Sequence, residues 1–362
     1  MRIAVDIMGG DNAPHEIVLG CVEAVKHLEE LPGVEQIIMV GRKDACDSEL
    51  AKLGVSLGPH LGFVEAASTV DMADKPVDAV RHKKDNSITK CMELVKSGEA
   101  QAMLSAGNSG AVAAAALMTL GRIKGVYRPI IACVLPTQSM RPMLLVDGGA
   151  NMDCEPNWLV QFAIMGSVYS EKVLGAKNPK VGLLSIGTEN GKGNEVTKAA
   201  FPLLEKSDVN FRGNVEGHDL LKGQIDVVVC DGFVGNAVLK TTESVARTIG
   251  SWLKSELVRN PFRKILAFFL RSAFKSLKKR MDPEVYGGAV LLGVPGACII
   301  THGASTHKAI YHTIHVAANA TRNELSPTIA KRIAEHRAKL AAEAEAAKAA
   351  ASTEESEASK KP

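Results

Sequence analysis

The sequence has few aromatic side chains: they make up 4% of its 362 residues, although 46% of the residues are hydrophobic. This imbalance indicates a core of valine, isoleucine, leucine and alanine packed beneath helices. The formal net charge of +3 is too small to predict nucleic-acid binding. The seven cysteines are scattered without a CxxC pair, which argues against a disulfide framework or a zinc site and fits a reducing cytoplasm.

The sequence also lacks segments that would send it into or across a membrane. No apolar run reaches the ~18–20 residues that a membrane-spanning helix needs. Met1 and Arg2 lead directly into an apolar stretch, so we expect no signal peptide. We expect a protein that is soluble or at most rests on a membrane surface.

Strand-like and helix-like segments alternate along most of the chain. The apolar runs of strand length lie at 2–7, 36–40, 101–106, 130–135, 143–147, 180–186, 225–230 and 297–301. The helix-like segments are 14–30, 87–97, 110–121, 156–173, 194–206 and 235–257. This alternation predicts a mostly parallel sheet in a single α/β domain over residues 1–334. Residues 335–362 are low in complexity and have almost no large apolar residue, so we expect a disordered tail or a frayed helix that cannot hold itself in place.

Six of the apolar runs end in short turns rich in glycine, asparagine and aspartate. These turns cover residues 7–11, 105–110, 146–153, 185–195, 230–236 and 301–306. In a doubly wound sheet such turns gather at the carboxyl ends of the strands. Their free N–H groups suit a small anion such as phosphate. We therefore predict one shared anion site along one edge of the sheet.

The segment 252–280 differs from the rest in charge and apolar content. Between Lys254 and Arg280 it carries nine basic residues and one acidic residue, and four of the nine phenylalanines. A helix opened by Pro261 would have one apolar face. It could pack on the core or in a dimer seam, or lie on an anionic membrane with its apolar face among the headgroups. Phe268 falls among the cations, where a helix packed on the core would seldom expose a phenylalanine. Its position therefore favours membrane binding over packing. The predicted membrane-binding residues are Phe262, Ile265, Leu266, Phe268, Phe269 and Leu270.

Several motifs together resemble the bacterial phosphate acyltransferase family. They are MRIAVDIMGGDNAP (1–14), AGNSGA (106–111), GRIKGVYRP (121–129), LLVDGGANMD (144–153), VQFAIMGSVYS (160–170), VGLLSIGTENGKGNE (181–195), DVVVCDGFVGN (226–236), YGGA (286–289) and HG (302–303). The resemblance is collinear from residue 1 to about residue 320. The tail after residue 335 lies outside it.

The resemblance implies transfer of a long-chain fatty acyl group from acyl carrier protein to inorganic phosphate, without a cofactor. The acyl phosphate would serve phospholipid synthesis through a membrane acyltransferase that acts on glycerol 3-phosphate. The implied fold is a Rossmann-like three-layer α/β/α sandwich, similar to phosphotransacetylases and isopropylmalate-type dehydrogenases. The family also implies a cytoplasmic homodimer attached peripherally to the inner face of the cell membrane.

Direct attack of phosphate on a thioester needs no protein nucleophile, because phosphate is already largely anionic near neutral pH. It needs positioning, relief of charge repulsion and hydrogen-bond donors for the developing oxyanion. Lys192 could reach phosphate as a mobile point charge, or be a solvated loop lysine. Asn236 could donate to the thioester carbonyl or to phosphate, or cap a helix. His302 is the predicted general acid for the leaving thiol.

The predicted phosphate and substrate contacts come from all six turns. They are Asp6, Gly9, Gly10, Asp11, Asn108, Ser109, Gly110, Asp147, Asn151, Glu189, Gly193, Asn194, Glu195 and Asp231. A metal site of four aspartates is conceivable from residue type, but phosphate with a lysine partner needs no divalent ion. The apolar groove for the acyl chain could follow 110–120 or 257–273, and cations of the second segment could dock the acidic carrier.

Two other functions fit parts of this pattern. A nicotinamide-dependent dehydrogenase could use the same sheet, but no GxGxxG motif occurs between a strand and a helix. A non-catalytic peripheral membrane protein that senses phosphate or acyl ligands would need the same basic segment. Turnover of an acyl thioester would separate an enzyme from such a sensor.

Overall fold

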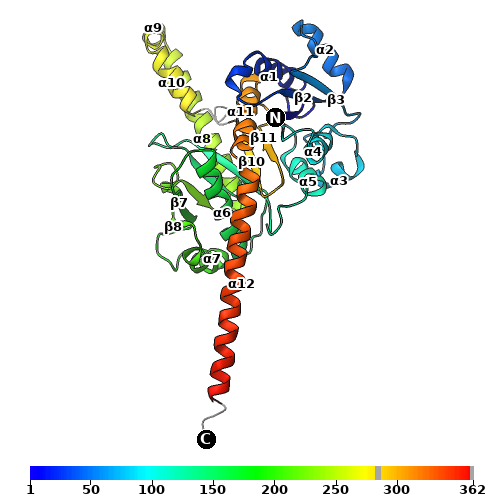
Figure 1. Ribbon diagram of the computed structural model, residues 1–362. Coiled ribbons are helices and arrows are strands. Elements are labelled where there is room, and N and C mark those ends of the chain that lie inside the picture. The colour runs from blue at the N-terminus through cyan, green and yellow to red at the C-terminus, as the bar shows by residue number, and fades with distance from the viewer. Residues whose placement is uncertain (282–286, 359–362) are drawn as a thin grey trace.

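The computed structural model describes residues 1–281 and 287–358, and a sheet of eleven strands runs through it (Figure 1). The strand order is β3-β2-β1-β4-β11-β10-β5-β6-β9-β7-β8. The strands are β1 Arg2–Asp6, β2 Gln36–Gly41, β3 Leu61–Glu65, β4 Ala102–Ser105, β5 Ile130–Leu135, β6 Met143–Val146, β7 Lys180–Leu184, β8 Asn210–Val215, β9 Val227–Val229, β10 Ala289–Leu292 and β11 Ala297–Ile300.

Strand direction divides the sheet into two halves. In the first half β3, β2, β1, β4 and β11 run parallel to one another. β10 is antiparallel to both β11 and β5, and β5 is antiparallel to β6. From β6 onward β9, β7 and β8 are again parallel. The sheet is mostly parallel, as predicted, but the carboxyl ends of its two halves lie at opposite edges.

Helices cover both faces of the sheet, which confirms the predicted α/β/α sandwich. They are α1 His15–Lys26, α2 Lys43–Leu53, α3 Pro76–His82, α4 Ser87–Ser97, α5 Ser109–Thr119, α6 Pro156–Lys172, α7 Glu195–Lys206, α8 Gly232–Val258, α9 Pro261–Phe269, α10 Arg271–Met281, α11 His307–Arg322 and α12 Leu325–Ala358. Short 3₁₀ helices cover Leu28–Glu30 and Gly217–Asp219.

Alternate residues of each buried strand face opposite layers of helices. In β1, Ile3 and Val5 join a core cluster with residues of α1, α6, α7, α11 and α12. Ala4 joins a second cluster with residues of α3, α4 and α5. Strands buried on both faces explain why the sequence shows continuous apolar runs instead of alternation.

Two helical segments extend from the sheet and its layers of helices: one is formed by α8, α9 and α10, and the other is α12. α8 carries α9 and α10 away from the sheet, at the upper left of Figure 1. The single helix predicted from Pro261 is thus two helices that part at Leu270. Among the described residues no helix is long and apolar enough to cross a membrane.

The C-terminal segment differs from its prediction. α12 continues to Ala358, so residues 335–358 are helical where we expected disorder or a frayed helix, and residues 359–362 lie outside the described residues. The first turns of α12 bury Ile329 and Ile333, and Lys339 pairs with Asp208 at 2.7 Å. Alanine, glutamate and lysine have high helix propensity, so they continue a helix that is already anchored.

Candidate active site

The six turns form two groups of three at opposite edges of the sheet. Turns 146–153, 230–236 and 185–195 follow the neighbouring strands β6, β9 and β7, and we call this group the lysine edge. Turns 7–11, 105–110 and 301–306 follow β1, β4 and β11, and we call this group the histidine edge. The prediction of a single shared edge is therefore wrong, because antiparallel pairing around β10 and β5 reverses the second half.

A buried carboxylate shapes the first turn of the lysine edge. Asp147 is fully buried, and its oxygens accept the N–H groups of Ile131 at 3.0 Å, Gly149 and Ala150 at 3.1 Å, and Asn151 at 2.7 Å. Burial raises the pKa of Asp147, and these hydrogen bonds oppose that rise. The side chain therefore points into the turn and not toward solvent.

Asn151 connects this turn to the segments beside it. Its amide donates to the Asp147 carboxylate and to the Pro129 carbonyl, both at 2.8 Å. The backbone carbonyl of Asn151 accepts the N–H of Gly232 at 2.7 Å. Asn151, predicted as a substrate contact, thus holds three segments of backbone together.

The second turn of this edge places an amide in solvent. Asp231 is the N-cap of α8 and accepts the N–H of Val234 at 2.8 Å, so the capping role considered for Asn236 belongs to Asp231. Asn236 is exposed one turn further along α8. A Cβ built on Gly149 would lie 3.6 Å from Asn236 Oδ1, so the amide borders the Asp147 turn.

The third turn of this edge carries the lysine. The Lys192 N–H donates to the Glu189 carbonyl at 3.0 Å, and Asn194 caps α7 by accepting the Thr197 N–H at 2.9 Å. Gly193 adopts φ +114°, a conformation that favours glycine. Lys192, Glu189, Asn194 and Glu195 are exposed. Within residues 1–281 and 287–358, no carboxylate forms an ion pair with Lys192, so its charge faces solvent.

Two polar residues beneath the lysine turn were missed by sequence reasoning. Asn214 is buried on β8, and its amide donates to the Glu189 carbonyl at 2.8 Å. Its Oδ1 and the Oγ of Ser185 have no hydrogen-bond partner among the described residues. Only the pairing of β7 with β8 brings Asn214 under this turn, and no spacing in the sequence signals it.

The turns of the histidine edge pack against one another. The buried Asp6 accepts the Ser105 hydroxyl at 2.6 Å and the Met8 N–H at 3.0 Å, and burial raises its pKa. The Asp11 N–H donates to the Gly303 carbonyl at 2.7 Å. A Cβ on Gly9 would lie 2.6 Å from the backbone nitrogen of Gly107. Gly9, predicted to admit a ligand, instead admits a neighbouring turn.

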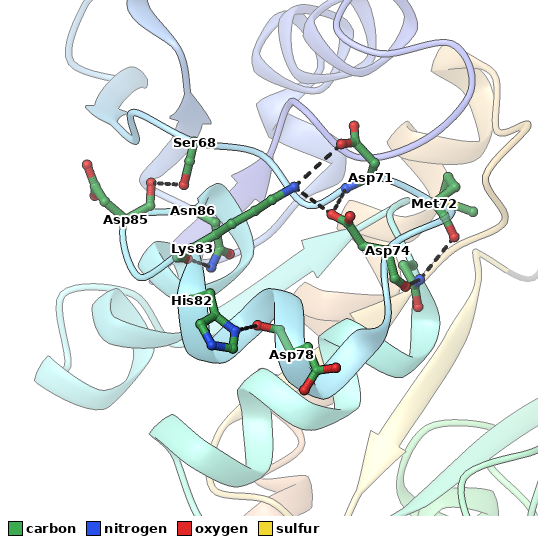
Figure 2. Close-up of polar contacts among 10 residues, drawn as sticks. Ser68, Asp71, Met72, Asp74, Asp78, His82, Lys83, Asp85 and Asn86 are labelled. Carbon is green, nitrogen blue, oxygen red and sulfur yellow. Dashed lines mark hydrogen bonds and ion pairs between the residues drawn. The ribbon is translucent and has the colours of Figure 1, made fainter.

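The helix N-terminus predicted to bind an anion at this edge already has partners. Asn108 caps α5 by accepting the Ala111 N–H at 3.2 Å, and it donates to the carbonyls of Met72 at 3.1 Å and Asp74 at 3.2 Å. Figure 2 shows this loop, in which Lys83 pairs with Asp74 at 2.6 Å. Ser109 and Gly110 are exposed beside it. Carboxylates of the same loop make this end of α5 less suited to phosphate.

The remaining predicted residues at this edge are also partnered locally. His302 is exposed, and its Nδ1 accepts the Ala304 N–H at 3.1 Å, which leaves Nε2 to carry the proton of the neutral ring. Gly10 has φ +106°, and a Cβ there would lie 2.9 Å from the Gly303 carbonyl. Strand direction keeps His302 away from Lys192 and Asn236.

The four aspartates considered for a metal site cannot meet. Asp6 and Asp11 lie at the histidine edge, whereas Asp147 and Asp231 lie at the lysine edge. In the described part of the chain, two groups of side chains have metal-like spacing, and they consist of other residues: His27 with Glu29 and Glu30, and Glu216 with His218 and Asp219.

Comparison with known proteins identifies the chain's relatives. A family model described as "Fatty acid synthesis protein" matches residues 1–327. A protein named phosphate acyltransferase from Desulfitobacterium hafniense is 48% identical over 334 residues, which are 92% of this chain and 97% of that protein. One of the same name from Desulforudis audaxviator is 48% identical, over 91% of this chain and 95% of its own. The solved phosphotransacetylase from Streptococcus pyogenes shares the fold, with a TM-score of 0.56, 17% identity and coverage of 89% and 94%.

Proposed function

Because the chain belongs to the fatty acid synthesis protein family and is an acyltransferase, as its phosphate acyltransferase relatives are, we propose the following reaction. The enzyme transfers a long-chain fatty acyl group from acyl carrier protein to inorganic phosphate at the lysine edge. The products are an acyl phosphate and free carrier protein. The observation that carries this proposal is the exposed Lys192 on a turn beside the exposed amide of Asn236.

The chemistry needs only what this edge offers. A phosphate oxygen attacks the thioester carbonyl carbon, and the carbonyl oxygen becomes an oxyanion. The C–S bond then breaks, and the thiolate takes a proton from solvent, as its pKa of about 8.5 permits. The Lys192 ammonium offsets the phosphate charge, and the Asn236 amide donates to the oxyanion or to phosphate. His302 has no role in this scheme, because it lies at the opposite edge.

Carrier protein and membrane contacts fall on the arm formed by α8, α9 and α10. Its exposed apolar residues between Pro261 and Leu270 are Phe262, Ile265, Phe268, Phe269 and Leu270, whereas the side chain of Leu266 lies outside the described residues. The Arg271 guanidinium lies over the Phe268 ring at 4.6 Å, so an aromatic face and a cation share one surface. We propose that this arm rests on the anionic inner face of the cell membrane.

The same surface would bring the product to its consumer. An acyl phosphate released beside the membrane would be taken up by a membrane acyltransferase that uses glycerol 3-phosphate. Homodimerisation through the arm and docking of the acidic carrier on its cations belong to the same proposal. Loss of vesicle binding after Phe262→Ser and Phe269→Ser, with turnover of soluble substrate intact, would support the membrane contact; unchanged vesicle binding would refute it.

Turnover tests the proposed reaction. Purified protein mixed with hexadecanoyl carrier protein and phosphate should release free carrier thiol and form acyl phosphate, detected by ³¹P NMR. Thiol release should depend on phosphate. Binding of both compounds without release of thiol would indicate the non-catalytic sensor instead.

A further inference from the structure

Each turn of the lysine edge carries one large apolar side chain that faces solvent. Met152 follows Asn151 in the first turn, Phe233 follows Gly232 in the second, and Ile186 begins the third. Their side chains are 52%, 69% and 80% exposed. No other large apolar side chain among the described residues is as exposed as Ile186. Exposure of three such side chains around one polar site marks a surface for an apolar ligand.

The backbone arranges the three side chains in the order of the strands. β9 lies between β6 and β7, so the turn with Phe233 lies between the turns with Met152 and Ile186. The Gly232 N–H donates to the Asn151 carbonyl at 2.7 Å, which joins the segments that carry Phe233 and Met152. Leu183 of β7 pairs with Val229 of β9. Ile186 follows Leu183 by three residues and Gly232 follows Val229 by three residues, so Ile186 and the residue before Phe233 lie at the same level beyond the sheet.

Phe233 also has a fixed relation to the proposed oxyanion donor. Phe233 and Asn236 are three residues apart on α8, so their side chains share one face of the helix. A thioester carbonyl that accepts from Asn236 would therefore place its first methylene groups near the Phe233 ring. Lys192 lies on the neighbouring turn, where phosphate would attack the same carbonyl.

We infer that Met152, Ile186 and Phe233 form the surface that binds the alkyl chain of the acyl donor, so that this edge selects long acyl chains. The inference rests on the proposed function. Apolar surface buried against these side chains favours each added methylene group, until the chain extends beyond them. The segments 110–120 and 257–273 are not needed for this contact.

Chain-length dependence of turnover tests this assignment. For Phe233→Ser we expect kcat/KM with hexadecanoyl carrier protein to fall about 10- to 100-fold, and with butanoyl carrier protein by less than about threefold. The KM for phosphate should not change. Met152→Ser should lower the hexadecanoyl value about threefold or more. Met118→Ser is the matched control, because Met118 is also 52% exposed but lies on α5. Equal losses with both donors, or a chain-length effect from Met118→Ser, would overturn the assignment.

Binding of dodecyl phosphate separates this inference from the proposed reaction. Calorimetry should show that Phe233→Ser weakens dodecyl phosphate binding about tenfold and leaves inorganic phosphate binding unchanged. If the protein shows this pattern but turns over no acyl carrier protein, the proposed reaction fails and the apolar surface stands. If Phe233→Ser leaves dodecyl phosphate binding unchanged, the surface is wrong whatever the turnover.

Discussion

The two edges of the sheet carry turns of the same composition and offer a ligand different environments. Each edge has a buried aspartate at the carboxyl end of a strand, Asp6 at one and Asp147 at the other, whose oxygens accept hydrogen bonds from the turn. At the lysine edge an exposed ammonium group and an exposed amide border these turns. At the histidine edge the glycines bring turn against turn, and carboxylates lie close by.

Charge at the helix N-termini sharpens this difference. At the histidine edge the first N–H of α11, from His307, donates to Glu16 at 2.6 Å, so a carboxylate already occupies the positive end of that helix. At the lysine edge Asp231 caps α8 with a carboxylate, but the uncharged Asn194 caps α7 beside Lys192. A glycine-rich turn therefore predicts an anion site only when the local charge leaves room for an anion.

Removal of the lysine should have the largest effect. Lys192→Ala should lower kcat about 100- to 1000-fold, because it removes the charge that offsets phosphate, and Asn236→Ala should act similarly by removing a donor. Both side chains are exposed, so the unfolding midpoint in urea should not move. Lys198→Ala, an exposed lysine on α7, is the control and should retain full activity. Full activity in Lys192→Ala would remove the lysine edge as the reaction site.

Close packing of the lysine edge predicts a second effect, on stability. A Cβ on Gly235 would lie 1.9 Å from the Asp147 carbonyl oxygen, so Gly235→Ala must push α8 away from the turn. We expect a loss of about 2–3 kcal/mol in unfolding free energy, together with a loss of activity. Gly191→Ala is the control, because nothing lies within 4 Å of its Cβ position. Equal stability of the two variants in urea would contradict this packing.

The helix contact of the histidine edge predicts a smaller and pH-dependent effect. The His307 N–H holds the pKa of Glu16 below its ordinary 4.5, so the ionised carboxylate stabilises the fold above that pH, and this stabilisation is lost as pH falls through the lower folded pKa. Glu16→Gln should lower the unfolding free energy by about 1 kcal/mol at neutral pH.

Unfolding of wild type and Glu16→Gln across the acid range measures this effect. The gap between them should be constant near neutral pH and shrink as pH falls below 4.5. Glu171→Gln, at an exposed position near the end of α6, should match wild type throughout. A gap that persists in strong acid would show that the Glu16 charge is not responsible.

The smallest effect is expected from the histidine itself. His302→Ala should change kcat less than about twofold, because His302 lies at the opposite edge from the proposed reaction, whereas removal of a true general acid would cost about 100-fold or more. The pH profile of kcat should likewise be unchanged. A loss comparable to that of Lys192→Ala would show that the two edges act together.

Sequence reasoning predicted the elements with strong local signals and missed those without them. The eight apolar runs all contain strands, but β3, β8 and β10 were missed: β3 and β8 contain glycine, and β10 is only four residues long. α11 was missed because its three histidines obscure its apolar face. Phosphotransacetylase likeness and the α/β/α layers were predicted and are confirmed.

The site was predicted in composition but not in arrangement. The turns that carry Lys192 and Asn236 could be found from glycine and asparagine following apolar runs. Their separation from His302 could not, because it depends on strand direction across the middle of the sheet. β10 is antiparallel to β11 and to β5, which lies more than 150 residues away in the chain, and β5 is antiparallel to β6, so β6 runs opposite to β11. The contact of Asn214 with Glu189 depends on a strand that the sequence did not reveal.

The Asp147 carboxylate has a consequence for how phosphate is received. Four backbone N–H groups are oriented by its two oxygens during folding, before any ligand arrives. The entropy cost of ordering that segment therefore arises when the protein folds, and phosphate binding does not add it again. We therefore expect phosphate to bind the lysine edge as a preorganised site, with a fast association rate and little change in backbone hydrogen exchange of the Asp147 turn.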